Sequence, residues 1–166
     1  MASVAAITVY RQPAGGSCNS HVGYVNGNII NLSVAGTVGG NTYQGCINSR
    51  DVSHEFGHAL GMFHEQQRCD RNSWVMINSQ LLGDDVNWGT GFCPNPSRWM
   101  ATTYDYKSVM QYDSWIVYPI SGPSYWNMLK TDGSLINTTI NSRENLISDS
   151  ARLPSVGDFA TMQAFY

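Results

Sequence analysis

Three of the four histidines of this sequence lie within eleven residues, at His54, His58 and His64. In a helix, the first two lie one turn apart on one face, so their imidazole rings can converge on a metal ion. Gly61 is a natural helix stop, and a left-handed conformation there lets His64 approach the same ion. Three neutral imidazoles that leave one coordination position open are typical of catalytic zinc. The spacing therefore predicts one Zn²⁺ per chain.

Glu55, directly after the first of these histidines, supplies a second catalytic group. Zinc lowers the pKa of a bound water to about 7, and a carboxylate within hydrogen-bond reach can accept the proton. The same carboxylate can then pass the proton to a leaving amine. We therefore expect Glu55 beside the metal and outside its ligand set, in a site that hydrolyses amides without a covalent intermediate. A structural helix with core histidines is the alternative. However, the five fixed positions of this motif coincide by chance in fewer than about one window per million. They are His54, Glu55, His58, Gly61 and His64.

The helix that would position these groups is expected to begin near Ser49, with Asn48 or Ser49 as its cap and Asp51 in its first turn. Its apolar residues recur at helical spacing. They are Val52, Phe56, Ala59, Leu60 and Phe63. This stripe lies opposite the histidines, so we expect the ligands to face a cleft while the back of the helix is buried.

The rest of the chain favours strands before this helix and an irregular segment after it. We expect a strand over 4–10, a hairpin of 21–25 and 28–34 across Asn26-Gly27, and a loop over 36–45. A short helix near 73–82 and a final helix over 155–165 follow. This order predicts an α+β fold with a cleft between two lobes. We expect a single domain over 1–166, with an N-terminal lobe over 1–64 and a C-terminal lobe over 65–166.

Composition excludes several classes of protein. The net charge is −3 and only two residues are lysine, so there is no clustered basic face for nucleic acid. No apolar run approaches the ~20 residues that cross a bilayer, so we expect no membrane segment. We expect a monomer.

The four cysteines, Cys18, Cys46, Cys69 and Cys93, allow three disulfide connectivities. Sequential pairing would close two loops that each stabilise the fold by roughly 3–4 kcal/mol. Four free thiols in a cytosolic protein are the alternative, but the even number and wide spacing favour a secreted, disulfide-bonded protein.

Two runs of sequence resemble the astacin family of metzincin metallopeptidases. The first is HEQQRCDRN at 64–72, and the second is YDYKSVMQY at 104–112. The resemblance extends over roughly residues 7–166. Asn72 and Gln111 depart from the family pattern, which usually has Asp and His there. Only six residues precede the strand that resembles Ile7–Tyr10, where the family has a strand and a long helix, so we expect a shortened N-terminal lobe.

The resemblance implies a zincin-like (metzincin) catalytic domain. In such a domain, a small mixed sheet and the zinc-binding helix lie above an irregular C-terminal lobe with a terminal helix. The zinc ligands it implies are His54, His58, His64 and Tyr112. It makes Glu55 the general base and acid, and Tyr112 a catalytic group that leaves the metal to bond the tetrahedral intermediate.

The resemblance also places Met110 in a turn beneath the metal and pairs Cys18 with Cys46. Cys69 and Cys93 lie outside the usual family pattern, and we infer that they pair with each other.

The function implied is a secreted zinc endopeptidase. A peptide or protein substrate would lie extended in the cleft and pair with an edge strand near Asn28–Val34. One alternative is a zinc-stabilised binding module that has lost catalysis, but such a module has no use for Glu55. Another is an adamalysin-like or matrixin-like branch of the metzincins, against which Glu65 and Tyr112 argue.

Overall fold

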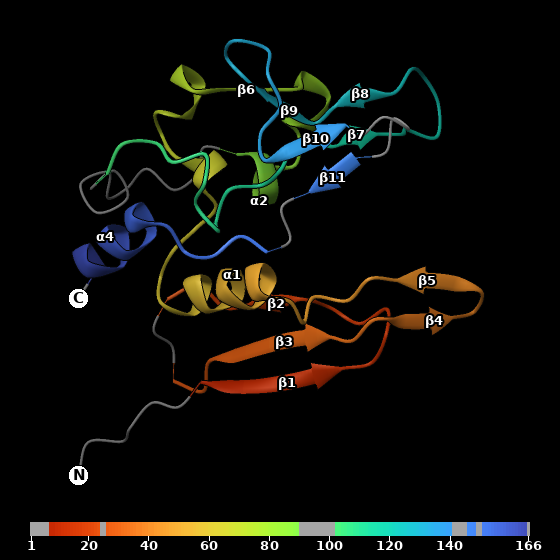
Figure 1. Ribbon diagram of the computed structural model, residues 1–166, viewed down its shortest axis with the longest axis vertical. Coiled ribbons are helices and arrows are strands. Elements are labelled where there is room, and N and C mark those ends of the chain that lie inside the picture. The colour runs from red at the N-terminus through yellow and green to blue at the C-terminus, as the bar shows by residue number, and fades with distance from the viewer. Residues whose placement is uncertain (1–6, 24–25, 90–101, 141–145, 149–150, 166) are drawn as a thin grey trace.

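The computed structural model describes residues 7–23, 26–89, 102–140, 146–148 and 151–165, and the fold is given for these. The N-terminal lobe contains a three-stranded sheet and the helix α1 (Ser49–Ala59) beside it (Figure 1). The sheet has the order β1 (Thr8–Gln12), β3 (Ile29–Ser33), β2 (Asn19–Ser20), with β1 parallel and β2 antiparallel to β3. This mixture of strands and helices confirms the predicted α+β class. The single domain and its division at residue 64 stay predictions.

The helix α1 forms where the sequence predicts it. Asn48 has an extended backbone, and its side chain accepts a hydrogen bond from the Asp51 N–H at 3.0 Å, which caps the first turn. The inner face of the helix packs on β3, where Ile30 and Leu32 form a buried cluster with Ala59. This packing fixes the helix on the sheet. Of the apolar stripe that we expected to be buried, Ala59 is buried and Phe56 is exposed.

Two strands occupy the segment that we expected to be a loop. β4 (Gly36–Val38) and β5 (Asn41–Tyr43) form an antiparallel hairpin. Gly39 and Gly40 connect them with φ of +57° and +82°, which is the left-handed pair that a tight hairpin turn requires. The prediction was wrong because these strands are largely exposed and lack the apolar alternation of a buried strand. The hairpin predicted from 21–25 and 28–34 is only partly correct. β3 lies within 28–34, but its antiparallel partner is β2 at 19–20, residues 21–23 form no strand, and 24–25 lie outside the described residues.

The C-terminal lobe contains short elements joined by turns. They are the 3-10 helices Glu65–Gln67, Arg71–Ser73 and Ser79–Leu81, the strands β6 (Val75–Ile77), β7 (Ile116–Val117), β8 (Tyr125–Trp126), β9 (Met128–Lys130), β10 (Thr138–Ile140) and β11 (Leu146–Ser148), and the helices α2 (Asp85–Trp88) and α4 (Val156–Phe165). The final helix predicted at 155–165 is confirmed as α4. The short helix predicted near 73–82 is wrong over Val75–Ile77, because β6 pairs with β9 across more than 50 residues of sequence, and only the 3-10 helix Ser79–Leu81 is helical in the second half of that range.

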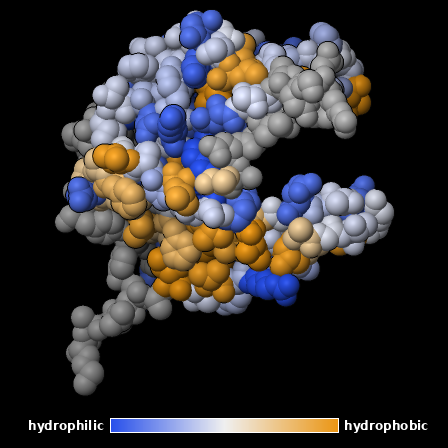
Figure 2. Space-filling view, viewed as in Figure 1, coloured by the Kyte–Doolittle hydropathy of each residue, from blue (hydrophilic) through white to orange (hydrophobic). Residues whose placement is uncertain are grey.

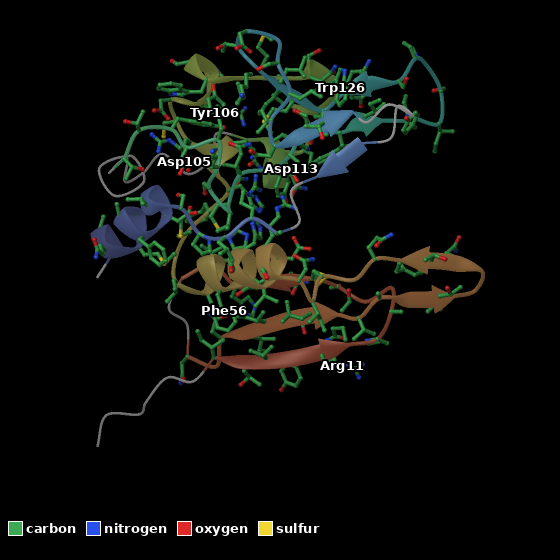
Figure 3. All side chains as sticks on the ribbon, viewed as in Figure 1. Arg11, Phe56, Asp105, Tyr106, Asp113 and Trp126 are labelled. Atoms are coloured by element: carbon green, nitrogen blue, oxygen red, sulfur yellow. A yellow bond between two sulfur atoms is a disulfide. The ribbon has the colours of Figure 1, made fainter. Side chains whose placement is uncertain are left out.

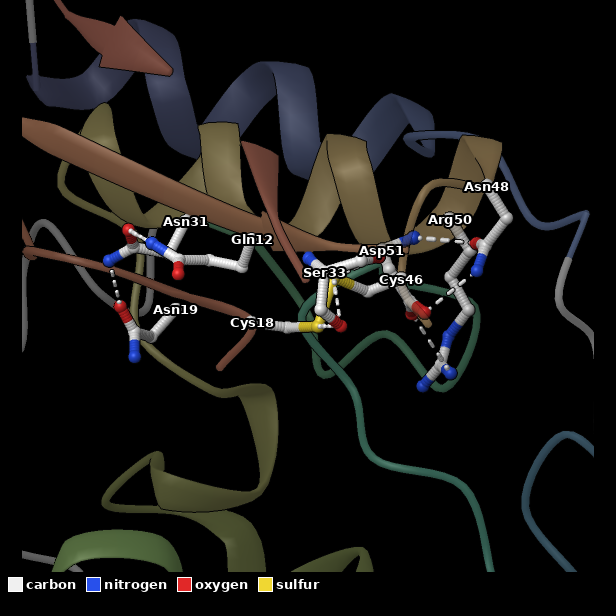
Figure 4. Close-up of a disulfide and its surroundings, with 9 residues drawn as sticks. All are labelled: Gln12, Cys18, Asn19, Asn31, Ser33, Cys46, Asn48, Arg50 and Asp51. Carbon is white, nitrogen blue, oxygen red and sulfur yellow. Dashed lines mark hydrogen bonds and ion pairs between the residues drawn. A yellow bond between two sulfur atoms is a disulfide. The ribbon is translucent and has the colours of Figure 1, made fainter. Parts of the chain in front are cut away.

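One predicted disulfide is present. Cys18 and Cys46 are bonded and join the start of β2 to the segment that leads into α1 (Figure 4). Cys69 is also disulfide-bonded, while its predicted partner, Cys93, lies outside the described residues. No cysteine in the described part of the chain is free. Within the same residues, no helix combines the length and the apolar character needed to cross a membrane.

The backbone makes a close approach at Gly45, directly before Cys46. Gly45 has φ of +68°, and a Cβ there would collide with the Ala35 nitrogen and lie 2.6 Å from the Val34 carbonyl carbon. Gly133 has a similar φ of +82°, but a Cβ there would meet nothing within 4 Å.

We therefore predict that Gly45→Ala lowers the free energy of unfolding by more than about 1 kcal/mol beyond the loss caused by Gly133→Ala. Both substitutions strain a left-handed backbone, and only the first also collides with backbone atoms. Urea unfolding of the two variants in excess zinc measures the difference. Equal losses would show that the loop around Gly45 moves aside freely.

Candidate active site

The end of α1 brings three histidines together. His54 and His58 lie one turn apart, and their Nε2 atoms are 3.1 Å from each other. The helix then ends in a Schellman motif, in which the Gly61 N–H donates to the His58 carbonyl and the Met62 N–H donates to the Gly57 carbonyl. Gly61 has φ of +98°, as predicted, and the turned chain returns His64 to the other two. Its Nε2 lies 3.1 Å from that of His58 and 3.2 Å from that of His54.

The hydrogen bonds of the histidines define which nitrogen is free. The His54 Nδ1 lies 2.8 Å from the Val109 carbonyl oxygen, and the His58 Nδ1 lies 2.7 Å from that of Met62. A carbonyl only accepts, so each Nδ1 carries the hydrogen and each Nε2 presents a lone pair. Two facing lone pairs cannot form a hydrogen bond, and a cation between them resolves the repulsion.

The three histidines fit zinc. Tetrahedral zinc with Zn–N distances of about 2.0–2.1 Å requires its nitrogens about 3.3–3.4 Å apart, slightly more than is found here. The pKa values also suit ligation, which requires neutral imidazoles. Burial, and then the neighbouring His58, lower the pKa of His54 to about 3. Burial likewise lowers the pKa of His58 and His64. Among the described residues, these three form the group that could hold a metal ion.

Glu55 lies in the wall of the same cavity. Its side chain is buried, with 6% exposure, and its Oε2 has no hydrogen-bond partner in the part of the chain that the structure describes. Burial, and then the charge of Asp51, raise the pKa of this carboxyl to about 7. A carboxyl with such a pKa readily takes up and releases a proton near neutral pH.

Tyr112 also reaches the site. The centroid of its ring lies 4.3 Å from that of His64, and its hydroxyl donates to the Asn87 Oδ1 at 3.4 Å. Burial, and then the charge of Glu55, raise the pKa of the phenol to about 12, so it is a hydrogen-bond donor at neutral pH. Its predicted roles as ligand and catalytic group stay predictions.

The predicted turn at Met110 lies against the metal-binding helix. Met110 is fully buried, and a Cβ at Gly57 would lie 2.5 Å from its sulfur, so only glycine fits there without displacing the methionine. The Met110 carbonyl accepts from the Glu65 N–H at 3.0 Å, which ties this turn to the chain just after the third histidine.

The histidines open into a cavity of about 380 Å³ that residues of both lobes line. Figure 2 shows the surface of the molecule hollowed between the two lobes. Asn19 and Ser20 of β2 line one side, and Asn87 and Tyr112 of the C-terminal lobe line another. The edge strand that we predicted near Asn28–Val34 is wrong. That segment is the central strand β3, which β1 and β2 flank, so β2 forms the sheet edge beside the cavity among the strands that the structure describes.

Sequence reasoning missed a buried charge cluster beside the site. Arg50, one turn before His54, lies 3.3 Å from Asp113, and Arg152 lies 3.1 Å from the same carboxylate. Figure 3 shows Asp113 in the C-terminal lobe above α1, so the cluster spans the two lobes. Both guanidinium groups contribute to the low pKa of His54, after burial and His58. No local pattern reveals this cluster, because its members are far apart in sequence.

Comparison with known proteins agrees with this geometry. Residues 3–155 match the family model Astacin, which describes a family of peptidases. The chain is 36% identical over 115 residues to zinc metalloproteinase nas-31 of Caenorhabditis elegans, a match of 68% of this chain and 17% of that protein. It is 41% identical over 68 residues to high choriolytic enzyme 2 of Oryzias latipes, a match of 41% of this chain and 24% of that protein. The chain thus spans no more than about a quarter of these two relatives.

A solved structure with a similar fold is that of high choriolytic enzyme 1, a hatching enzyme zinc-protease from Oryzias latipes. The TM-score is 0.56 with 25% identity, over 96% of this chain and 68% of that chain. The metzincin form of the α+β fold and the zinc cofactor are therefore confirmed. Because the family match covers most of its length, the chain belongs to the astacin family of zinc metallopeptidases.

Proposed function

We propose that this chain acts as a zinc endopeptidase in which His54, His58 and His64 hold the ion. The observation that carries the proposal is the convergence of three Nε2 atoms in a cavity that Glu55 also lines. Bound zinc would lower the pKa of a water to about 7 and polarise the peptide carbonyl. The residues of the chain supply the proton transfers and the positioning.

Glu55 is the general base and acid of this mechanism. Its carboxylate takes the proton of the attacking water and delivers it to the amine that leaves. The pKa of about 7 supports both steps, since a group with a pKa near the working pH exchanges protons in either direction. Its position in the cavity wall, one residue after His54, places it beside the ligands.

Tyr112 stabilises the negative oxygen that forms during the reaction and is a further ligand of the resting site. The phenol keeps its proton at neutral pH, so it can donate to an oxyanion. Its present hydrogen bond to Asn87 is long, at 3.4 Å, and is therefore easily exchanged for a shorter one.

The substrate is a peptide or protein segment that binds extended in the cavity. The free edge of β2 at Asn19–Ser20 supports this, because an edge strand offers unpaired backbone groups to an extended peptide. The disulfides support a secreted location. We propose a monomer as the working form.

A zinc-stabilised binding module remains the alternative function. It would keep the three histidines and would have no need for a buried carboxyl in the cavity wall. The burial of the Glu55 carboxyl costs free energy, and a catalytic role accounts for that cost whereas a binding role does not. Removing the Glu55 carboxylate therefore separates the two functions.

Glu55→Gln should retain one zinc per chain and lower kcat/KM for a fluorogenic peptide by about 10²–10⁴-fold, because the amide keeps the shape and loses the base. Metal analysis and peptide cleavage measure the two quantities. Loss of zinc would make Glu55 a ligand, and full activity would leave it without a catalytic role.

Tyr112→Phe should also keep its zinc, since the three imidazoles remain, and kcat/KM should fall by about 10²–10³-fold through loss of the oxyanion donor. The same cleavage assay tests it. If kcat/KM matched that of the wild type, Tyr112 would have no place in the mechanism.

His58→Ala should lose both zinc and stability, because metal binding energy contributes to the folding free energy. His21, exposed and outside the three-histidine group, provides the control His21→Ala, which should keep both. Zinc content and Tm are the measurements. A His58→Ala protein that retains wild-type zinc affinity would contradict the ligand assignment.

A further inference from the structure

Asp158 is a buried carboxylate in the first turn of α4, with 2% exposure. Its Oδ1 accepts from the Ser108 hydroxyl at 2.5 Å. Its Oδ2 accepts from the Val109 N–H at 3.0 Å and from the Ser155 N–H at 2.8 Å. Two of these three donors belong to the turn beneath the histidines, although they are about 50 residues away in sequence.

The bonds of Ser108 extend this contact to the metal site. The Ser108 Oγ accepts from the Met110 N–H at 3.0 Å. That N–H belongs to the same peptide group as the Val109 carbonyl, whose oxygen lies 2.8 Å from the His54 Nδ1. An unbroken series of hydrogen bonds therefore runs from His54 through one peptide group and one serine to the carboxylate, and every donor points toward Asp158.

Hydrogen bonds in series polarise one another, and the effect is strongest where water is excluded. Ser108, Val109 and Met110 are buried, with 0–1% exposure. A peptide group whose N–H donates toward a carboxylate has a more negative carbonyl oxygen. That oxygen binds the Nδ1–H of His54 more tightly, which fixes the ring and makes its Nε2 a better ligand.

We propose that Asp158 is a positioning residue of the metal site, which acts on His54 through Ser108 and the Val109–Met110 peptide group. A histidine ligand often donates directly to a carboxylate. Here a serine and a peptide group lie between the two. The inference rests on the proposed function in one respect, that His54 is a zinc ligand.

Asp158 also makes contacts through which it could act in other ways. It belongs to the start of α4, where its N–H donates to the Ser155 Oγ at 3.0 Å. The same hydroxyl donates to Asp105 at 2.5 Å. The charge of Asp158 also acts on Glu65, next to the third histidine. A test must separate the hydrogen-bond series from these structural and electrostatic effects.

Two serines make this separation possible. Ser108→Ala breaks the series and keeps the charge of Asp158. Ser155→Ala removes two hydrogen bonds at the start of α4 and leaves the series intact, so it is the matched structural control. Asp158→Asn removes the charge and keeps the shape.

The experiment titrates the zinc-loaded wild type, these three variants and the Ser108→Ala/Asp158→Asn double variant with a chromophoric chelator, and measures Tm in excess zinc. Ser108→Ala and Asp158→Asn should each raise the zinc Kd about 10-fold. The zinc Kd of the double variant should also be about 10-fold above that of the wild type, since both changes break the same series of hydrogen bonds. Ser155→Ala should lower Tm and leave the Kd within about twofold of the wild type.

The proposal is wrong if Ser108→Ala and Asp158→Asn leave the zinc Kd unchanged in a series whose wild type binds one zinc. It is also wrong if the double variant raises the zinc Kd about 100-fold, because the two substitutions would then act independently. A Ser155→Ala protein that loses zinc affinity equally would reduce Asp158 to a structural role. If Asp158→Asn does not fold, the comparison of Ser108→Ala with Ser155→Ala decides. A wild type that binds no zinc would instead overturn the proposed function, so the two failures are distinct.

Discussion

Three imidazole Nε2 atoms that lie 3.1–3.2 Å from one another impose the central constraint on this structure. The facing lone pairs of His54 and His58 repel without a cation, so the protein must hold these rings by other contacts. The helix α1 holds two rings, the turn at Gly61 brings in the third, and the backbone carbonyls of Val109 and Met62 fix two of the Nδ1 atoms. Val109 belongs to the C-terminal lobe. The metal site is therefore complete only when the two lobes meet.

Burial favours the neutral form of five titratable groups in the site. It lowers the pKa of the three imidazoles and raises the pKa of Glu55 and Tyr112, and each shift favours the neutral form. The cavity thus offers uncharged nitrogen ligands, a carboxyl near its titration point and a protonated phenol. A divalent cation enters such a site without displacing protons from the histidines, and its charge would compensate for their repulsion.

The features that could be predicted from sequence are those set by nearby residues. Three such features are the capped start of α1, the one-turn spacing of His54 and His58 and the left-handed Gly61. Each depends on residues within about ten positions along the chain, which is the length of one helix. Features that depend on distant partners were missed. Val75–Ile77 is a strand because Met128–Lys130 pairs with it. Ile29–Ser33 is a central strand because it pairs with β1 on one side and β2 on the other. Asp158 belongs to the same class, since its partners lie about 50 residues away.

The central claim is that one zinc ion lies between three histidines while Glu55 remains outside its ligands. An anomalous difference map recorded at the zinc absorption edge, from crystals of the zinc-loaded protein, tests this claim most directly. We predict one peak, about 2.0–2.1 Å from the Nε2 atoms of His54, His58 and His64. A peak elsewhere, or one with the Glu55 carboxylate among its ligands, would contradict the claim.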